Sequence, residues 1–438
     1  MTARSATLPF PWAMPVLVLA LIALGLLFVQ SSTAGTRLDG LEGRQLQMVL
    51  ASLPILIAFA AFGYRRLARN AFVLYGIGVL SLVAVLVVGV HSNGARRWFD
   101  GPMGFRVQPS EVMKPLLVLA LARWLQFREA PERLRDLVVP LLLAAVPAAL
   151  VKIEPDLGTA LFYVPILAAI LWAAGARKRF FAGAFLVVAV AAPAAYFSPF
   201  LADFQKKRVQ TFFKSVREKS GEVDDARRAA SNAPNEKVRA RETARADALQ
   251  AQLSDLKRGE GYQSHCAQTS IGSGGWLGKG LGQGPQNRLE YLPARHTDFV
   301  FAVIAEEWGF AGSCGILVLF CLLGLSFLSV AAGTRDRFSR LVCVGAAACL
   351  VPQAFANIAM ASGLMPVTGI PLPFVSHGGS SLFASFALLG MVVAAARSQR
   401  NHEPFLYPRP NVDPPDPFAA RVAAEPVRDA AYGRGPAL

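Results

Sequence analysis

The stretch that decides the fold runs from residue 261 to residue 310 and reads GYQSHCAQTSIGSGGWLGKGLGQGPQNRLEYLPARHTDFVFAVIAEEWGF. Seven glycines lie between Gly272 and Gly284, and glycine disfavours regular helices and strands. The stretch then becomes apolar but keeps Glu306 and Glu307, although lipid solvates charges poorly. We therefore expect a flexible polar loop that enters a membrane helix beside two carboxylates, an arrangement typical of a functional site.

Composition places the chain among polytopic membrane proteins, because 54% of its 438 residues are hydrophobic and 17% are charged. The net charge of +15 comes from short loops and one polar insert, as in most inner-membrane proteins, so we expect no nucleic-acid partner. The five cysteines have no paired spacing, and no histidine or cysteine cluster has zinc-ligand spacing. The sequence thus indicates neither a disulfide framework nor a structural zinc site.

Apolar runs of roughly 17 to 25 residues predict the membrane helices. The first run lacks a cleavage signal, so we expect it to remain in the protein as a span. The predicted fold is an all-α polytopic membrane protein with about ten transmembrane helices. They lie near residues 14–31, 47–63, 72–91, 109–126, 138–153, 156–174, 180–199, 298–330, 338–363 and 377–396.

Basic residues predict the orientation of these spans. Arginine and lysine follow the second, fourth, sixth, eighth and tenth spans, and such residues mark cytoplasmic loops. Both termini are then cytoplasmic. The segment that carries Arg96 and Arg97 breaks this pattern on the outer side, which suggests that these residues bind a ligand.

The resulting organisation has one large external loop between the seventh and eighth helices. Its middle is rich in Ala, Arg and Glu and is expected to form an exposed helix or hairpin without chemistry. The proline-rich C-terminal tail is expected to be disordered. The predicted divisions are a cytoplasmic N-terminus at 1–13, helices one to seven at 14–199, the loop at 200–297 with its insert at 217–252, helices eight to ten at 298–396, and the tail at 397–438.

Two polar motifs precede the fourth span, NGARRW at residues 93–98 and QPSEVMK at residues 108–114. The proline favours a helix start, which the glutamine before it or the serine after it could cap. Glu111 and Lys114 then share one helical face at a spacing of three residues and can pair. The pair is either structural or part of a cationic site for an anionic headgroup, together with Arg96 and Arg97.

Three further motifs are candidate functional sites. The acidic stretch at residues 154–160, EPDLGTA, could mark a cation site or a polar helix cap. The glycine-rich loop fails the Walker A pattern around Gly278 and Lys279, so its glycines more plausibly bring backbone amides close to a phosphate or sugar. The run GLMPVTGIPLPFVSHGGSS at residues 363–381 predicts a rigid external turn or a re-entrant segment that lines a cavity.

Together these motifs closely resemble the SEDS family (shape, elongation, division and sporulation) of RodA and FtsW proteins, with RodA the better match. The matching segments are NGARRW, QPSE-x-x-K, PDLGTAL, GYQ, IGSGG, GKG-x-G-x-G, HTDF, EE-x-G and PVTGIPLPF with GGSS. The resemblance implies ten membrane helices and a peptidoglycan glycosyltransferase that polymerises lipid II outside the cytoplasmic membrane. It also implies a class B penicillin-binding protein and other elongasome or divisome membrane proteins as partners.

The resemblance implies an essential aspartate in the external loop, shortly before Gly-Tyr-Gln. Asp255 is the nearest match, although this chain lacks the proline that usually follows and has about one extra residue before Gly-Tyr-Gln. Glu260 is the alternative carboxylate, and His377 stands where a tyrosine is common. The candidates on the substrate side are Arg96, Arg97, Glu111, Lys114, Arg208, Lys279, Gln283, His296, Asp298 and Ser376.

The expected reaction needs a general base for the attacking sugar hydroxyl and cations for the departing pyrophosphate. Asp255 suits the first task, and the basic candidates suit the second. A divalent cation, Mg²⁺ or Mn²⁺, could share this work, but the sequence shows no dedicated ligand set. Two alternatives stay open. One is a lipid II flippase whose path is lined by the intramembrane carboxylates and Lys114, and the other is a scaffold that has lost catalysis and docks through its insert.

Overall fold

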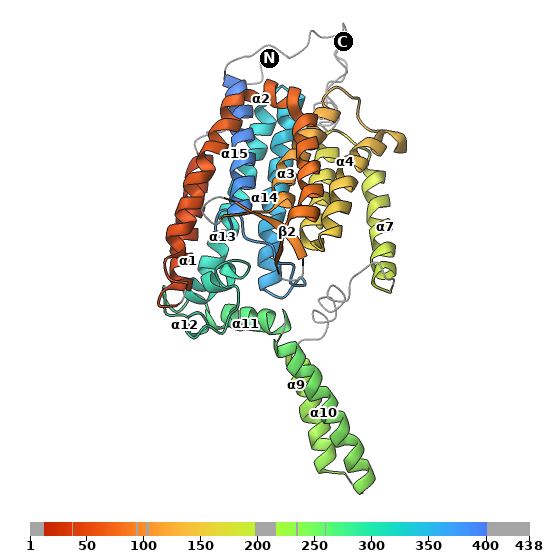
Figure 1. The fold of residues 1–438 in the computed structure, drawn as a ribbon, viewed down its shortest axis with the longest axis vertical. Helices are drawn as coiled ribbons and strands as arrows, with labels where there is room; N and C mark the ends of the chain where they lie inside the picture. Colours follow the sequence, from red (N-terminus) through yellow and green to blue (C-terminus); the bar gives the residue numbers. More distant parts are fainter. Residues whose placement is uncertain are drawn as a thin grey trace, which may run out of the picture.

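The computed structural model describes residues 13–36, 38–92, 95–101, 105–197, 216–233, 235–258 and 260–400. Helices dominate it, and the long ones stand side by side in one bundle (Figure 1). The helices of the bundle are α1 (Ala13–Thr33), α2 (Leu41–Val88), α3 (Pro109–Leu125), α4 (Leu134–Ile153), α5 (Leu157–Leu161), α6 (Tyr163–Ala173), α7 (Lys178–Phe197), α13 (Val300–Gly333), α14 (Arg337–Ala361) and α15 (Gly379–Arg400).

Each predicted span coincides with a helical segment. The second and third spans both lie in α2, which is broken at Gly63, where φ is 69° and ψ is 153°. Glycine adopts this left-handed φ without a Cβ penalty, so the chain can change direction there. The sixth span comprises α5 and α6. Among the described residues, six helices are long and apolar enough to cross a membrane by length and composition.

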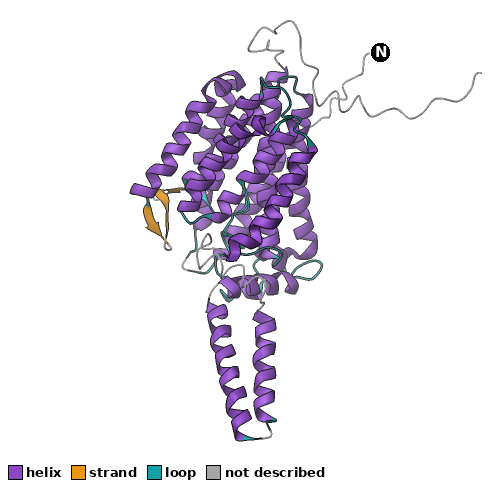
Figure 2. Ribbon diagram, turned by 90° about the vertical axis from the view of Figure 1, so that its right-hand side faces the viewer, coloured by secondary structure: helices purple, strands orange, loops and turns teal. Residues whose placement is uncertain are grey.

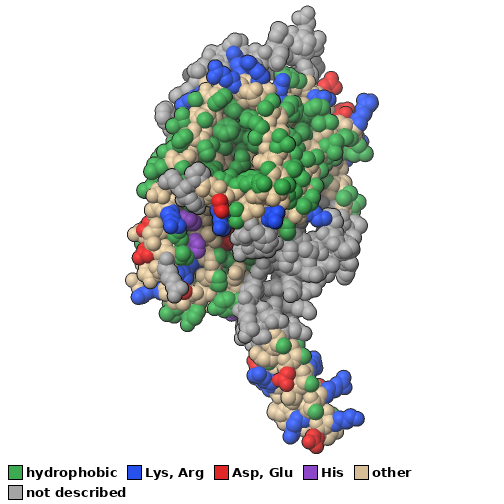
Figure 3. Space-filling view, viewed as in Figure 1, with side chains coloured by type: hydrophobic (Ala, Val, Ile, Leu, Met, Phe, Trp, Pro, Cys, Tyr) green, Lys and Arg blue, Asp and Glu red, His purple; other side chains and the backbone are tan. Residues whose placement is uncertain are grey.

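A belt of apolar side chains crosses the visible face of the bundle, and charged groups lie above and below it (Figure 3). Leu19, Leu80 and Phe185 are 65%, 68% and 77% exposed. Large apolar side chains are rarely exposed in such numbers in soluble proteins, whereas lipid solvates them well. The protein is therefore a multi-pass membrane protein.

The predicted basic loops meet at one end of the bundle. The Arg337 guanidinium donates to the carbonyl oxygens of Arg128 and Ala174 at 2.5 and 3.1 Å. Arg177 pairs with Glu132 at 2.9 Å. These contacts join the loops after the fourth, sixth and eighth spans, as the charge pattern predicts.

The opposite end carries the remaining elements. A small antiparallel sheet of β1 (Val90–Ser92), β2 (Ala95–Asp100) and β3 (Arg106–Val107) links α2 to α3. This sheet is a small addition to the predicted all-α fold, which the structure confirms. It forms because the segment between these spans turns back on itself, and its backbone groups pair between the strands. Helices α11 (Glu260–Ser273) and α12 (Pro285–Arg288) lie at the same end.

The insert forms a helical hairpin that projects away from the bundle (Figure 2). Its helices, α9 (Val216–Ser231) and α10 (Glu236–Arg258), pack against each other through the small buried side chains Val223, Ala226 and Ala246. The hairpin meets the rest of the described protein chiefly through α11. The predicted exposed hairpin is therefore confirmed.

We predict that the hairpin contributes little to the stability of the bundle, because few of its side chains contact the spans. Replacing residues 222–248 by a short Gly-Ser linker should leave the midpoint of thermal unfolding in detergent unchanged. Val223→Asp in the full chain serves as the control, since it should loosen the hairpin alone. A clear drop in the midpoint of the shortened chain would contradict this view.

Candidate functional site

The predicted ion pair lies in the interior of the bundle. Lys114 Nζ donates to Glu111 Oε1 at 2.6 Å, and both side chains are buried. A second donation, at 2.8 Å, goes to Gln353 Oε1 on α14. The ammonium also lies 5.6 Å from the centre of the Phe162 ring, within the range of a cation–π contact. The charge of Lys114 is thus neutralised inside the protein.

The start of α3 is built differently from the prediction. Pro109 does occupy the first turn, but neither predicted capping side chain bonds the helix N-terminus. The Gln108 amide instead donates to Asp156 Oδ2 at 2.7 Å, and its backbone N–H donates to Ser380 Oγ at 2.7 Å. The capping prediction is therefore wrong, because these groups connect α3 to α5 and α15.

The contacts of Asp156 distinguish between a cation site and a polar helix cap, the two interpretations of the EPDLGTA motif. Its carboxylate accepts from the Thr159 N–H at 3.2 Å and from the Thr159 hydroxyl at 2.9 Å. Asp156 is the N-cap of α5, as side-chain oxygens often are at helix starts. The motif thus contains a polar helix cap.

Glu154 is a buried carboxyl group whose two oxygens have no hydrogen-bond partner among the described residues. Its side chain is 1% exposed. Its pKa is raised to about 8, mainly by burial and to a smaller extent by the neighbouring Asp156 charge, whereas Arg97 acts in the opposite direction. The group is therefore mainly protonated at neutral pH.

The two arginines of the NGARRW motif have different surroundings. The Arg97 guanidinium donates to the carbonyl oxygens of Glu154 and Pro155 at 2.9 and 2.6 Å. Arg96 is exposed and donates to the Val87 carbonyl at 3.2 Å. Arg97 therefore fixes the acidic turn, and Arg96 faces the solvent beside it.

The glycine-rich loop packs directly on α13. The backbone N–H groups of Lys279 and Gly280 donate to the carbonyl oxygens of Glu306 and Glu307 at 3.1 and 2.9 Å. A Cβ atom at Gly278 would overlap the Glu307 carbonyl. The backbone amides of Lys279 and Gly280 are thus bonded to α13.

The two carboxylates of the EE motif anchor the end of the bundle opposite the basic loops. Glu306 accepts from the backbone N–H groups of Gln286 and Asn287 at 3.0 and 3.3 Å, at the start of α12. Glu307 accepts from the Ser31 hydroxyl at 2.7 and 2.8 Å and from the Asn287 amide at 2.9 Å. Both carboxylates are fully buried, and their hydrogen bonds join α1, α12 and α13.

The proline-rich run at 363–378 is re-entrant, as one of the two interpretations predicted. A Cβ atom at Gly25 of α1 would lie 2.7 Å from the Val375 carbonyl oxygen. Gln45 of α2 donates to the same carbonyl at 3.0 Å. Ser376 Oγ donates to the Thr297 carbonyl at 2.5 Å, so the run also contacts the segment that precedes α13.

A pair of histidines lies where these two segments meet. The His296 and His377 ring centres are 6.2 Å apart, and the backbone N–H of His377 donates to the backbone carbonyl of His296 at 2.9 Å. Burial lowers the pKa of both imidazoles. The pKa of His377 falls to about 4, with smaller contributions from His296 and Arg44. Both rings are therefore mainly neutral at neutral pH.

The remaining predicted residues are less closely assembled. Lys279 Nζ donates to Ser273 Oγ at 2.8 Å and lies 3.6 Å from Glu306 Oε1, while 31% of its side chain stays exposed. Gln283 accepts from Arg288 at 3.3 Å. Asp255 lies near the end of α10 and Glu260 at the start of α11, but their side chains, like all of Arg208, lie outside the described part of the chain.

The sequence motifs do not indicate two buried side-chain amides on α14, those of Gln353 and Asn357. Asn357 Nδ2 donates to the carbonyl oxygens of Asp298 and Ile370 at 2.8 and 2.7 Å. Gln353 Nε2 donates to the Pro371 carbonyl at 3.1 Å. Polar residues four positions apart in a membrane span share one face and are costly in lipid, and this signal could have found them.

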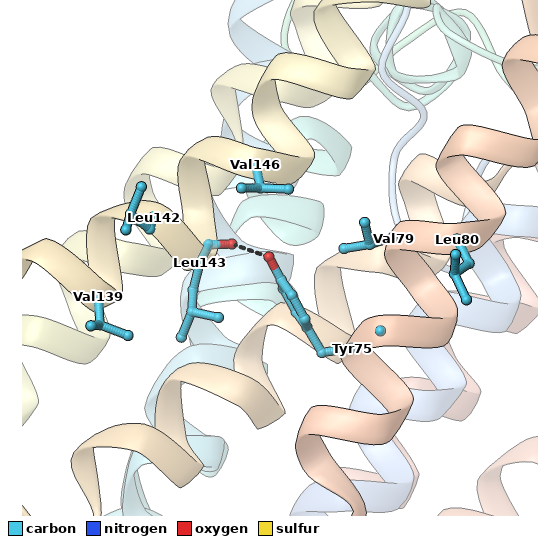
Figure 4. Close-up of a pocket in the computed structure, with 8 residues that line it drawn as sticks. Tyr75, Val79, Leu80, Val139, Leu142, Leu143 and Val146 are labelled. Carbon is cyan, nitrogen blue, oxygen red and sulfur yellow. Dashed lines mark hydrogen bonds between the residues drawn. The ribbon is translucent and has the colours of Figure 1, made fainter.

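An apolar groove of about 480 Å³ lies between α2 and α4 (Figure 4). The Tyr75 hydroxyl, its main polar group, donates to the Leu143 carbonyl at 2.9 Å. Because its lining is almost entirely aliphatic, the groove offers no group for acid–base chemistry. The candidate site is therefore the polar cluster at the end of the bundle opposite the basic loops.

We predict that Glu154→Gln changes how stability depends on pH. In the unfolded chain this carboxyl ionises near its usual pKa of 4.5, whereas in the folded protein it ionises near pH 8. Between these values the unfolded state binds fewer protons, so the wild type loses stability as pH rises. The unfolding midpoint of the variant should therefore rise relative to that of the wild type between pH 5 and pH 8. The exposed Glu129→Gln variant should show no such trend, and a constant difference for Glu154→Gln would refute the assignment.

We predict that Glu306→Ala loosens the glycine-rich loop. The change leaves the N–H groups of Gln286 and Asn287 without their acceptor, at a cost of about 1–3 kcal/mol for each buried group. Hydrogen exchange at residues 279–288 should accelerate, and the unfolding midpoint should fall. Glu306→Gln keeps one acceptor oxygen and should show a smaller effect. Unchanged exchange in the alanine variant would argue against this role.

Comparison with known proteins agrees with this arrangement. The model of the family described as "Cell cycle protein" (FtsW, RodA and SpoVE) matches residues 11–229 and 238–401. Peptidoglycan glycosyltransferase MrdB of Escherichia coli K12 is 33% identical over 382 residues, which cover 87% of this chain and 92% of MrdB. The probable peptidoglycan glycosyltransferase FtsW of Mycobacterium tuberculosis is 33% identical over 394 residues, which cover 88% of this chain and 66% of FtsW.

Solved structures show the same fold. The rod shape determining protein RodA of Thermus thermophilus has a TM-score of 0.60 at 30% identity, covering 90% of this chain and 98% of that chain. A chain of a peptidoglycan synthase complex that coordinates polymerization and crosslinking has a TM-score of 0.68 at 31% identity, covering 90% of this chain and 99% of that chain. The chain therefore belongs to the FtsW, RodA and SpoVE family of cell cycle proteins.

Proposed function

We propose that the protein is a peptidoglycan glycosyltransferase that polymerises lipid II into glycan strands during cell elongation or division. We infer that it works in the bacterial cytoplasmic membrane, at its outer face. The observation that carries the proposal is the convergence of the polar motifs at the end of the bundle opposite the basic loops. The names of the curated relatives support the same activity.

The proposed reaction joins two sugars. The 4-hydroxyl of one sugar attacks the anomeric carbon of the next, the bond to the lipid pyrophosphate breaks, and the hydroxyl proton passes to a base. Asp255 is the proposed general base, and a carboxylate can act in this way when it lies within hydrogen-bond reach of the hydroxyl. It lies on α10, just before α11 leads into the glycine-rich loop.

Cations must stabilise the pyrophosphate as it departs. The exposed Arg96 and the partly exposed Lys279 can approach it directly. Lys114 is buried in its ion pair, and Arg97 acts by holding the turn at Glu154. Mg²⁺ or Mn²⁺ is a further candidate, since these ions bind phosphate oxygens. Among the described residues, no group of three Asp, Glu, His or Cys could hold such an ion.

We further propose that the protein acts with a class B penicillin-binding protein, which would cross-link the new strands, and with other elongasome or divisome membrane proteins. One structural relative comes from a peptidoglycan synthase complex that couples polymerization with crosslinking. The chain covers 99% of that relative's length, which supports a comparable assembly here.

The test of the proposed function is polymerisation of purified lipid II by the wild type and by Asp255→Asn. Loss of a general base should lower the rate by roughly 10²-fold or more. Asp247→Asn is the matched control, because Asp247 is an exposed carboxylate on the same helix, and it should keep wild-type activity. Glu260→Gln tests the second carboxylate in the same assay.

The outcomes distinguish the three hypotheses, which are an enzyme, a flippase and a scaffold. Polymer from the wild type and none from Asp255→Asn supports the enzyme with this base. Full activity of Asp255→Asn refutes the assignment, and a dead Glu260→Gln variant would then transfer the role. Movement of lipid II across vesicles without polymer would instead support the flippase. A protein that binds its partner but neither moves nor polymerises lipid II would be a scaffold.

A further inference from the structure

Gln353 occupies a junction between the buried ion pair and the re-entrant run. It is 2% exposed and lies on α14, which packs alongside α3. Its oxygen accepts from Lys114 Nζ at 2.8 Å. Its nitrogen donates to the Pro371 carbonyl at 3.1 Å and lies 3.4 Å from Ser381 Oγ. One amide thus bonds the cation on one side and the re-entrant run on the other.

The geometry points to Gln353 as a positioning residue, which couples the re-entrant run at Pro371 to the Lys114–Glu111 ion pair and so sets where the Lys114 ammonium lies. This inference rests on the proposed function and adds to it a residue that does not touch substrate. Glu111 supplies the charge that neutralises Lys114, at a distance of 2.6 Å. A lysine ammonium has three donors on a flexible stem, so one partner leaves its position underdetermined. Gln353 supplies a second fixed point.

Coupling follows from the rigidity of the amide group. Its oxygen and nitrogen are joined through one planar carbon, so they cannot move independently. If the Pro371 carbonyl shifts, Gln353 must either follow it and pull the Lys114 ammonium with it, or leave a buried polar atom without a hydrogen-bond partner. The second choice is costly in the interior. A displacement of the re-entrant run by a bound sugar would therefore reach the ion pair.

Asn357 provides a matched control within the same helix. It lies one turn further along α14, is fully buried, and donates to the Ile370 carbonyl at 2.7 Å, beside Pro371. It also donates to the Asp298 carbonyl at 2.8 Å. These two hydrogen bonds thus hold the same run without involving Lys114. A purely structural role would make the two amides equivalent, whereas positioning of Lys114 would separate them.

The test compares three variants for lipid II polymerisation. Gln353→Met keeps the length of the side chain but removes both hydrogen bonds, and it should lower kcat about tenfold or more, since small misplacements of charged groups are costly. KM should change little. Gln353→Glu keeps an oxygen toward Lys114 and should recover part of kcat. Asn357→Leu should lower the unfolding midpoint at least as much as Gln353→Met does but should leave kcat closer to that of the wild type.

A second measurement does not depend on activity. Shifts in the unfolding midpoint caused by Gln353→Met and Lys114→Met should be strongly non-additive, because the two side chains touch. Those of Asn357→Leu and Lys114→Met should nearly add. Additive shifts for Gln353 and Lys114, or equal losses of kcat in Gln353→Met and Asn357→Leu, would overturn the inference. A wild type that makes no polymer would refute the proposed function, whereas the midpoint shifts would still decide the contact between Gln353 and Lys114.

Discussion

The buried charge of Lys114 is the constraint on which the arrangement of the bundle depends. A charge in a low-dielectric interior must be paired and hydrogen-bonded in place. Glu111 meets the first need and Gln353 the second, at 2.6 and 2.8 Å. Because Gln353 also bonds Pro371, satisfying one ammonium group fixes α3, α14 and the re-entrant run relative to one another.

The polar groups at the end of the bundle opposite the basic loops fall into two kinds. Glu306, Glu307 and Arg97 are bonded to backbone or side-chain groups of neighbouring segments, and they hold the loops in place. Arg96 and Lys279 keep part of their side chains in solvent. Such a division is expected of a site that needs a rigid frame and a few accessible charges. The accessible charges are cationic, which suits a substrate with a pyrophosphate group.

Local patterns in the sequence predict much of the fold, and long-range pairing explains the rest. Apolar run length locates the spans, and a spacing of three residues predicts the contact between Glu111 and Lys114. The sequence gives no direct sign that Gln108 reaches Asp156 or that Arg97 reaches Glu154, because those partners are 48 and 57 residues away. Capping rules favoured a local bond for Gln108, and a partner from another helix replaced it. The charge pattern around Arg97 predicts a ligand, and it gives no sign of the two backbone carbonyls that accept hydrogen bonds from this side chain.

The distribution of polar side chains along α3 bears on the choice between an enzyme and a flippase. A path for a polar headgroup needs polar groups across the whole membrane. From Pro115 to Ala122, α3 runs PLLVLALA toward the end with the basic loops, and all of these residues are buried. Lys114 is thus the last polar side chain on this part of the helix, and the polar cluster stops near it. A polar cluster confined to one end of the bundle favours chemistry at one face of the membrane over transport through it.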